Sequence, residues 1–163
     1  MGAQALAMAA WLEQTGPAVW VRTSAWAYPA VEVVHLAGLS LLIGTAVAFD
    51  LRLLGVSSRL PADAMARHLL PWARVGFTLA LASGLLLFTT QAATYVQQGV
   101  FFLKLGAIGI GVANASIFGR GTYRDVRLWN YAPTPPAAAR AAAVVSLASW
   151  SCALVCGRLL AYL

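Results

Sequence analysis

The chain has 163 residues, of which 61% are hydrophobic and only 10% are charged, and its formal net charge is +6. A soluble domain carries about 25% charged residues, so this composition excludes a water-soluble globular protein. The sequence contains no nucleotide-binding loop, catalytic triad or zinc motif, so hydrolase and kinase chemistry are not expected.

Residues 1–24 form a separate N-terminal segment in our interpretation. They lack the basic region and cleavage site of a secretory signal, so we expect them to be retained. The run Ala5–Gln14 has a helical composition, and Gly16-Pro17 is expected to end it. Three tryptophans suit a helix that lies at the lipid headgroups on the outer side of the membrane: Trp11, Trp20 and Trp26.

Four apolar stretches are long enough to cross a membrane, because about 20 residues of helix span the hydrocarbon layer. They cover about 27–54, 69–90, 100–118 and 141–163. The short alternating segments of a transmembrane β-barrel are absent from the sequence. We therefore predict an all-α fold, in which residues 25–163 form a four-helix transmembrane bundle.

The basic residues cluster in two of the three connections. Four arginines surround the first loop (Arg52, Arg59, Arg67 and Arg74), and four surround the third (Arg120, Arg124, Arg127 and Arg140). The second loop, 91–99, has no charge. This asymmetry predicts cytoplasmic first and third loops and outer termini in a bacterial inner (plasma) membrane. The positive charge thus needs no nucleic-acid partner, and the third loop, 119–136, is expected to be an exposed connector.

Ionisable residues inside a membrane span are costly and are therefore candidates for function. Glu32, His35 and Asp50 fall within an arc of roughly 60° on the first long helix, so they share one face. His68 opens the second helix at the depth of Asp50, about 22 Å along the axis from His35. The two histidines cannot share one metal ion or one haem iron.

The polar residues sort by depth into two layers. The outer layer contains Glu32, His35, Lys104, Arg158 and Cys156, and the inner layer contains Asp50, Arg52, His68, Arg74 and Asn114. Unpaired charges at these depths are expensive. We therefore expect Asp50 and Arg74 to form a buried ion pair.

His35 has several interpretations. The first is a structural role, in which a hydrogen bond to Glu32 or a hydroxyl, worth about 1 kcal/mol, holds two helices together. The second is an axial ligand of haem b, with Lys104 and Arg158 binding an anionic group such as a propionate. Snorkelling to the outer interface explains Lys104 and Arg158 equally well.

Two cysteines, Cys152 and Cys156, share a face of the last helix. Packing is their simplest role, and a soft-metal pair is the alternative. Copper bound at His35 would have only these two thiols as soft ligands within the spans.

A stripe of small residues follows one side of the third span, where it would let another helix approach closely. Its members are Gly106, Gly109, Ala113 and Ser116. We expect this stripe to serve packing within the bundle, or to bind a partner or a second copy of the chain.

Several motifs resemble a bacterial family of short four-helix membrane proteins that has no established activity. They are Tyr28-Pro29, Glu32, His35-Leu36-Ala37-Gly38, Gly44, Asp50-Leu51-Arg52-Leu53-Leu54-Gly55, Pro71-Trp72, Ser83-Gly84 and Lys104-Leu105. The resemblance covers the chain from Trp11 onwards. The His-Leu-x-Gly element is also similar to the first helix of the copper-resistance protein D group and its haem-binding relatives. That similarity implies a ligand role for His35 alone.

Three hypotheses follow for the function. The first is a ligand-binding or redox membrane protein with His35 as a haem ligand. The second is a non-catalytic membrane component that packs against a partner. The third is a copper or ion permease that uses Glu32, His35 and Asp50.

Overall fold

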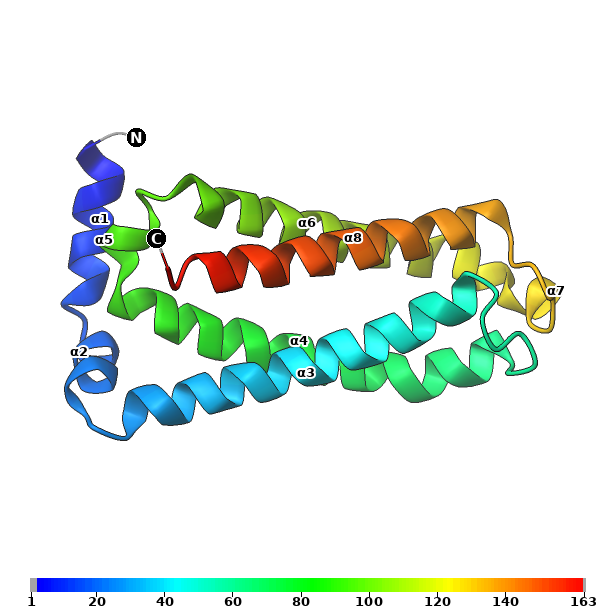
Figure 1. Ribbon diagram of the computed structural model, residues 1–163, viewed down its shortest axis with the longest axis horizontal. Coiled ribbons are helices and arrows are strands. Elements are labelled where there is room, and N and C mark those ends of the chain that lie inside the picture. The colour runs from blue at the N-terminus through cyan, green and yellow to red at the C-terminus, as the bar shows by residue number, and fades with distance from the viewer. Residues whose placement is uncertain (1–2, 163) are drawn as a thin grey trace.

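The computed structural model describes residues 3–162, and all regular elements within them are helices. Four are long and apolar enough to cross a membrane: α3 (Ala27–Leu53), α4 (Ala62–Thr90), α6 (Gly99–Arg120) and α8 (Ala137–Leu159). They run side by side along the long axis, each opposite in direction to the one before it (Figure 1). The prediction of an all-helical fold with four membrane-compatible helices is confirmed.

The four helices form two antiparallel pairs. Helix α3 packs along α4, and α6 packs along α8. The pairs meet chiefly through α3 and α8, whereas α4 and α6 share at most a marginal contact within residues 3–162. The bundle is therefore less tightly closed on the side of α4 and α6.

Two glycines let α3 and α4 cross at backbone distance. A Cβ atom on Gly76 would lie 2.5 Å from the backbone nitrogen of Leu42 and 2.8 Å from the carbonyl oxygen of Gly38. A Cβ atom on Gly38 would lie 2.6 Å from the backbone nitrogen of Ala80. Small residues at such a crossing bring the whole length of two membrane helices into contact.

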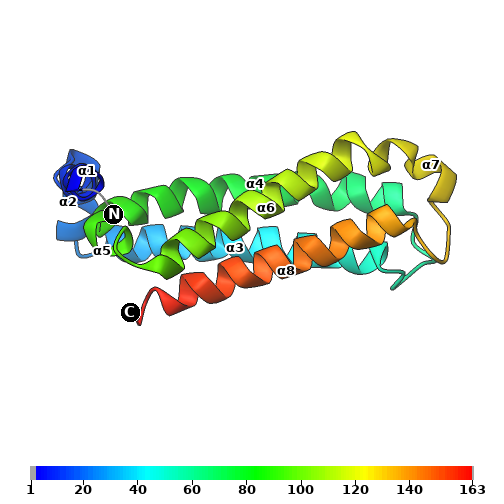
Figure 2. The ribbon, with the colours of Figure 1, turned by 90° about the horizontal axis from the view of Figure 1, so that it is seen from above.

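The N-terminal helices α1 (Ala3–Glu13) and α2 (Gly16–Thr23) lie across one end of the long helices (Figures 1 and 2). Gly16-Pro17 begins α2 rather than simply ending the first helix, because proline is well tolerated in a first helical turn. The carboxylate of Glu13 accepts a hydrogen bond of 2.8 Å from the backbone N–H of Ala93, beside the short helix α5 (Ala92–Tyr95). The N-terminal segment therefore contacts the connection between α4 and α6 at this end of the long helices.

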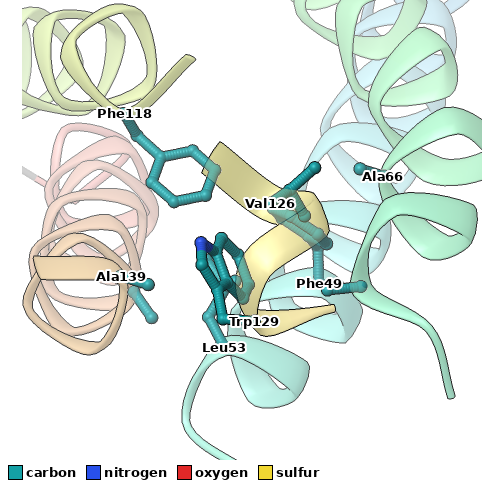
Figure 3. Packing of buried hydrophobic residues seen from close by; sticks show 9 residues of the cluster. Phe49, Leu53, Ala66, Phe118, Val126, Trp129 and Ala139 are labelled. Carbon is teal, nitrogen blue, oxygen red and sulfur yellow. The ribbon is translucent and has the colours of Figure 1, made fainter. Parts of the chain in front are cut away.

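The opposite end is closed by the third connection, which contains η1 (Thr122–Asp125) and α7 (Val126–Trp129). The expectation of an exposed connector is wrong for this part. Val126 and Trp129 are buried in an apolar cluster with Phe49, Leu53 and Phe118 (Figure 3). Burial of these side chains ties the connection to both helix pairs.

Helix α4 begins at Ala62, seven residues before the predicted start at 69. Its first turns are polar and carry an ion pair between Asp63 and Arg67 at 2.6 Å. Pro71 consequently lies inside the helix rather than near its first turn. It leaves the carbonyl of Arg67 without its usual helical donor. Helix α8 likewise begins at 137 and ends at 159, rather than covering 141–163.

Candidate functional site

His35 is bonded to the neighbouring helix α4. Its Nδ1 atom lies 2.9 Å from the carbonyl oxygen of Ala80 and 3.1 Å from the hydroxyl of Ser83. A carbonyl can only accept, and the Ser83 hydroxyl already donates to the carbonyl of Leu79 at 2.5 Å. Nδ1 therefore carries the proton, and Nε2 is the ring nitrogen left for another interaction.

The imidazole of His35 also packs against Gly84. A Cβ atom there would lie 2.9 Å from Cε1 of the ring and 3.3 Å from Nδ1. The ring thus occupies space that any larger residue at position 84 would need. Glu32 or a hydroxyl group was expected to be the hydrogen-bond partner of His35. The structure shows that the partner is the hydroxyl of Ser83 and not the carboxylate of Glu32.

The other predicted outer-layer residues divide into two groups. Glu32 lies one helical turn before His35 on α3, and Lys104 is half-buried, with its ammonium 3.6 Å from where a Cβ on Gly157 of α8 would lie. Arg158 is instead exposed, donates to the hydroxyl of Tyr162 and lies over its ring. Arg158 therefore binds Tyr162, and within residues 3–162 no hydrogen bond or ion pair joins Glu32, Lys104 or Arg158 to His35.

The two cysteines touch through their side chains. Cys152 Sγ lies 3.9 Å from Cys156 Sγ, and both thiols are free. Across residues 3–162, no three His, Cys, Asp or Glu side chains converge as a metal site would require. His68, an exposed residue, lies 12 residues before Ala80 on α4, or about 18 Å along the helix. The histidines are separated, as the depth argument predicted.

A cavity of about 690 Å³ lies nearer the α7 end. Its floor consists of buried or half-buried residues of α3 and α8, including Leu42, Asp50 and Ser146. Its rim consists of exposed residues of α4 and α6, including Arg74 and Arg120. The cavity thus opens where α4 and α6 fail to pack.

Asp50 is the one acidic residue among those lining this cavity. Its side chain is 95% buried, since only 5% of its surface is exposed, and its Oδ2 atom has no hydrogen-bond partner. A buried carboxylate oxygen without a partner is costly, and a proton or a cationic neighbour would offset this cost.

The predicted ion pair between Asp50 and Arg74 is wrong. Arg67 and Asp63 form the ion pair found within the described chain. Because Gly76 faces Leu42 across the crossing, Arg74 faces about residue 44 on α3. That position is six residues, or about 9 Å, from Asp50 along the axis. Arg74 instead extends along the rim, where it is exposed.

Aromatic side chains supply much of the remaining wall. Phe49 packs edge-on against Phe118 with ring centroids 6.0 Å apart, and Phe77 packs similarly against Trp150 at 6.2 Å. Tyr123 also lines the cavity, 6.0 Å from Phe118. A mostly apolar wall with a few polar groups is typical of small-molecule sites.

The sequence predicted only the depth of Arg52 in the membrane. In the structure its side chain is almost completely buried and binds backbone groups. Its guanidinium donates to the carbonyls of Leu60 (2.6 Å), Ser58 (3.3 Å) and Asn130 (3.0 Å). Asn130 in turn accepts from the backbone of Asp63 at 2.9 Å. Arg52 therefore joins the first loop to the third, a structural role that composition could not show.

The predicted stripe on α6 does not pack inside the bundle. Gly106, Gly109 and Ala113 are exposed, and a Cβ on either glycine would meet nothing within 4 Å. The inward face carries Gly111 instead, where a Cβ would lie 3.2 Å from the ring of Trp150. Small residues occupy both faces of this helix, so their spacing did not identify the packed one.

Comparison with family models, with curated proteins and with solved structures gives no significant match to this sequence. The site is therefore interpreted from its own geometry.

Proposed function

We propose that this protein binds a small lipophilic molecule in the cavity around Asp50. The observation that carries the proposal is a space of about 690 Å³ that contains a 95% buried carboxylate with an unpartnered oxygen. Its volume lies within the range of about 300–1,000 Å³ that ligand sites occupy. The exposed rim on α4 and α6 provides an entrance from the bilayer.

We further propose that the protein lies in a bacterial inner membrane, with its α7 end in the cytoplasm and both termini outside. The clustering of arginines around the first and third loops supports this orientation, because cytoplasmic loops are enriched in basic residues. The cavity then opens in the cytoplasmic half of the bilayer.

Filling the cavity tests the ligand-binding proposal. Both Ala113 and Ala115 are exposed on α6, but only Ala115 lines the cavity. Native mass spectrometry of the full chain, purified in mild detergent, is expected to show a bound lipophilic molecule. Ala115→Phe should remove it and Ala113→Phe should retain it. Equal occupancy in both variants, or none in the wild-type protein, would contradict the proposal.

A haem-type ligand at His35 is the second candidate. It is favoured by the donation from Nδ1 to a backbone carbonyl, which is how ligating histidines are commonly oriented, with Nε2 left free. The fit is weaker than at Asp50, because the cavity of about 690 Å³ is not lined by His35 and the imidazole packs directly against Gly84. The α3 and α4 helices, or the two pairs, would have to separate to admit a macrocycle.

The absorption spectrum tests the second candidate. Protein produced with ample haem should show a Soret band, and His35→Ala should remove it while His68→Ala leaves it unchanged. A colourless wild-type protein, or a band that persists in His35→Ala, would exclude His35 as the ligand.

A further inference from the structure

We infer that the ligand of the Asp50 cavity is a zwitterionic amphiphile, with an ammonium group at Asp50 and a phosphate or carboxylate at Arg74 and Arg120. This inference rests on the proposed ligand-binding function and names the chemical class of the ligand.

Asp50 accounts for the cationic group of the inferred ligand. It is the one acidic side chain among the residues that line the cavity, and no basic side chain of the described chain lies within ion-pair distance of it. An ammonium group placed there would satisfy the carboxylate through a charge-assisted hydrogen bond. The neighbouring rings, such as Trp150 and Tyr123, add faces that attract cations.

Two arginines account for the anionic group of the inferred ligand. Arg74 and Arg120 line the same cavity from its exposed rim, and neither forms an ion pair with any residue in the described range 3–162. Guanidinium groups bind phosphate and carboxylate with paired hydrogen bonds. A simple cation would leave both arginines unmatched, and a simple anion would leave Asp50 unmatched.

The charged groups lie toward one part of the cavity and an apolar wall continues beyond them, as in an amphiphile. Asp50 and Arg120, the last residue of α6, lie toward the α7 end, and Arg74 lies about 9 Å further into the bundle than Asp50. Beyond Arg74 the wall is apolar, with Leu42 and Phe77. The charged head of an amphiphile would therefore lie toward the α7 end, and its acyl chain would follow the apolar wall.

Competition between two phospholipids with identical acyl chains tests the inference. Phosphatidylethanolamine and phosphatidylglycerol are offered to the full chain at equal concentrations, and occupancy is read by native mass spectrometry. The wild-type protein should prefer phosphatidylethanolamine by about tenfold. Asp50→Asn should abolish this preference. Asp63→Asn, which removes a carboxylate outside the cavity, should keep it.

Arg74→Gln gives an independent measurement, because its side chain is exposed and its replacement leaves the buried carboxylate intact. It should weaken the binding of both phospholipids, whereas Arg67→Gln, away from the cavity, should weaken neither. A competition with soluble glycerophosphoethanolamine shows whether the ligand comes from the bilayer or from solution. If the soluble compound displaces the bound lipid, the ligand is a soluble zwitterion, and if it does not, the ligand is a bilayer lipid. Both results agree with the inferred chemistry.

Equal binding of the two phospholipids by the wild-type protein would overturn the inference. So would a preference that survives Asp50→Asn. If Ala115→Phe still blocks binding in those cases, the cavity remains a ligand site and only the ligand class is wrong. If Ala115→Phe does not block binding, the proposed function itself fails.

Discussion

His35 shows how a single polar side chain is accommodated between two membrane helices. Its Nδ1–H group is shared between the carbonyl of Ala80 and the hydroxyl of Ser83, and its ring lies against Gly84. The hydrogen bonds offset the cost of placing a polar ring among apolar helices. The missing side chain at position 84 is what allows the ring to reach them.

The pair formed by His35 and Gly84 gives a prediction at this scale. Gly84→Ala should displace the imidazole and lower the free energy of unfolding by roughly 1 kcal/mol, the net value of a typical hydrogen bond. In a His35→Ala background the same substitution should have no such cost, because the clash is gone. Thermal unfolding of the four proteins in detergent measures this coupling. Additive effects would show that the ring and the glycine are independent.

Helices α3 and α4 depend on glycine in a different way, because backbone rather than side chain occupies the space. A Cβ on Gly76 would fall 2.5 Å from a backbone nitrogen of α3, which no rotamer change can relieve. Gly106 on α6 is also a membrane-helix glycine, yet it faces open space. Close packing therefore requires glycine at position 76 but not at position 106, although the residue type is the same.

Gly76→Ala is therefore expected to destabilise the protein, by about 1–3 kcal/mol as for other overpacked sites. Gly106→Ala should be neutral or slightly stabilising, since alanine favours helix over glycine by up to about 1 kcal/mol. Thermal midpoints measured in the same detergent compare the two variants. Similar losses at both positions would mean that the α6 stripe is packed in the native protein.

The long helices were predictable from the sequence because each needs only a sufficient apolar length. The start of α4 was not, since Asp63 and Arg67 made its first turns resemble a loop although a helix can extend beyond the hydrocarbon layer. The packed face of each helix was harder to predict than its ends. Gly109 and Gly111 are the same residue type, yet Gly109 faces open space and Gly111 faces the ring of Trp150. Asp50 and Arg74 were predicted as a buried ion pair rather than as residues that line a cavity, because the distance between them depends on the helix register, which the sequence does not show.

At the scale of the whole molecule, the two helix pairs are joined unevenly. They meet through α3 and α8 and are locked at the α7 end by the apolar cluster and by Arg52, whereas α4 and α6 stand apart. The uneven joining is what creates a cavity with a rim on one side. The proposed orientation decides which leaflet that rim faces.

Cysteine labelling tests the orientation. In a background with Cys152 and Cys156 replaced by serine, single cysteines are placed at exposed positions of the three connections: Leu60, Gln97 and Thr134. A membrane-impermeant thiol reagent should label Gln97→Cys in intact cells. It should label Leu60→Cys and Thr134→Cys only after the membrane is opened. The reverse pattern would invert the proposed orientation.

The contacts of Arg52 also bear on the order in which the protein is made. Its guanidinium binds the carbonyl of Asn130, a residue synthesised 78 positions later. While the chain emerges, the first hairpin must therefore insert with this cation unmatched on one side, at the aqueous surface where water can solvate it. Only when the third span has crossed and its connection has returned to that surface does the contact close. Biogenesis of the bundle thus has a late step, in which the last connection seals a hairpin inserted first.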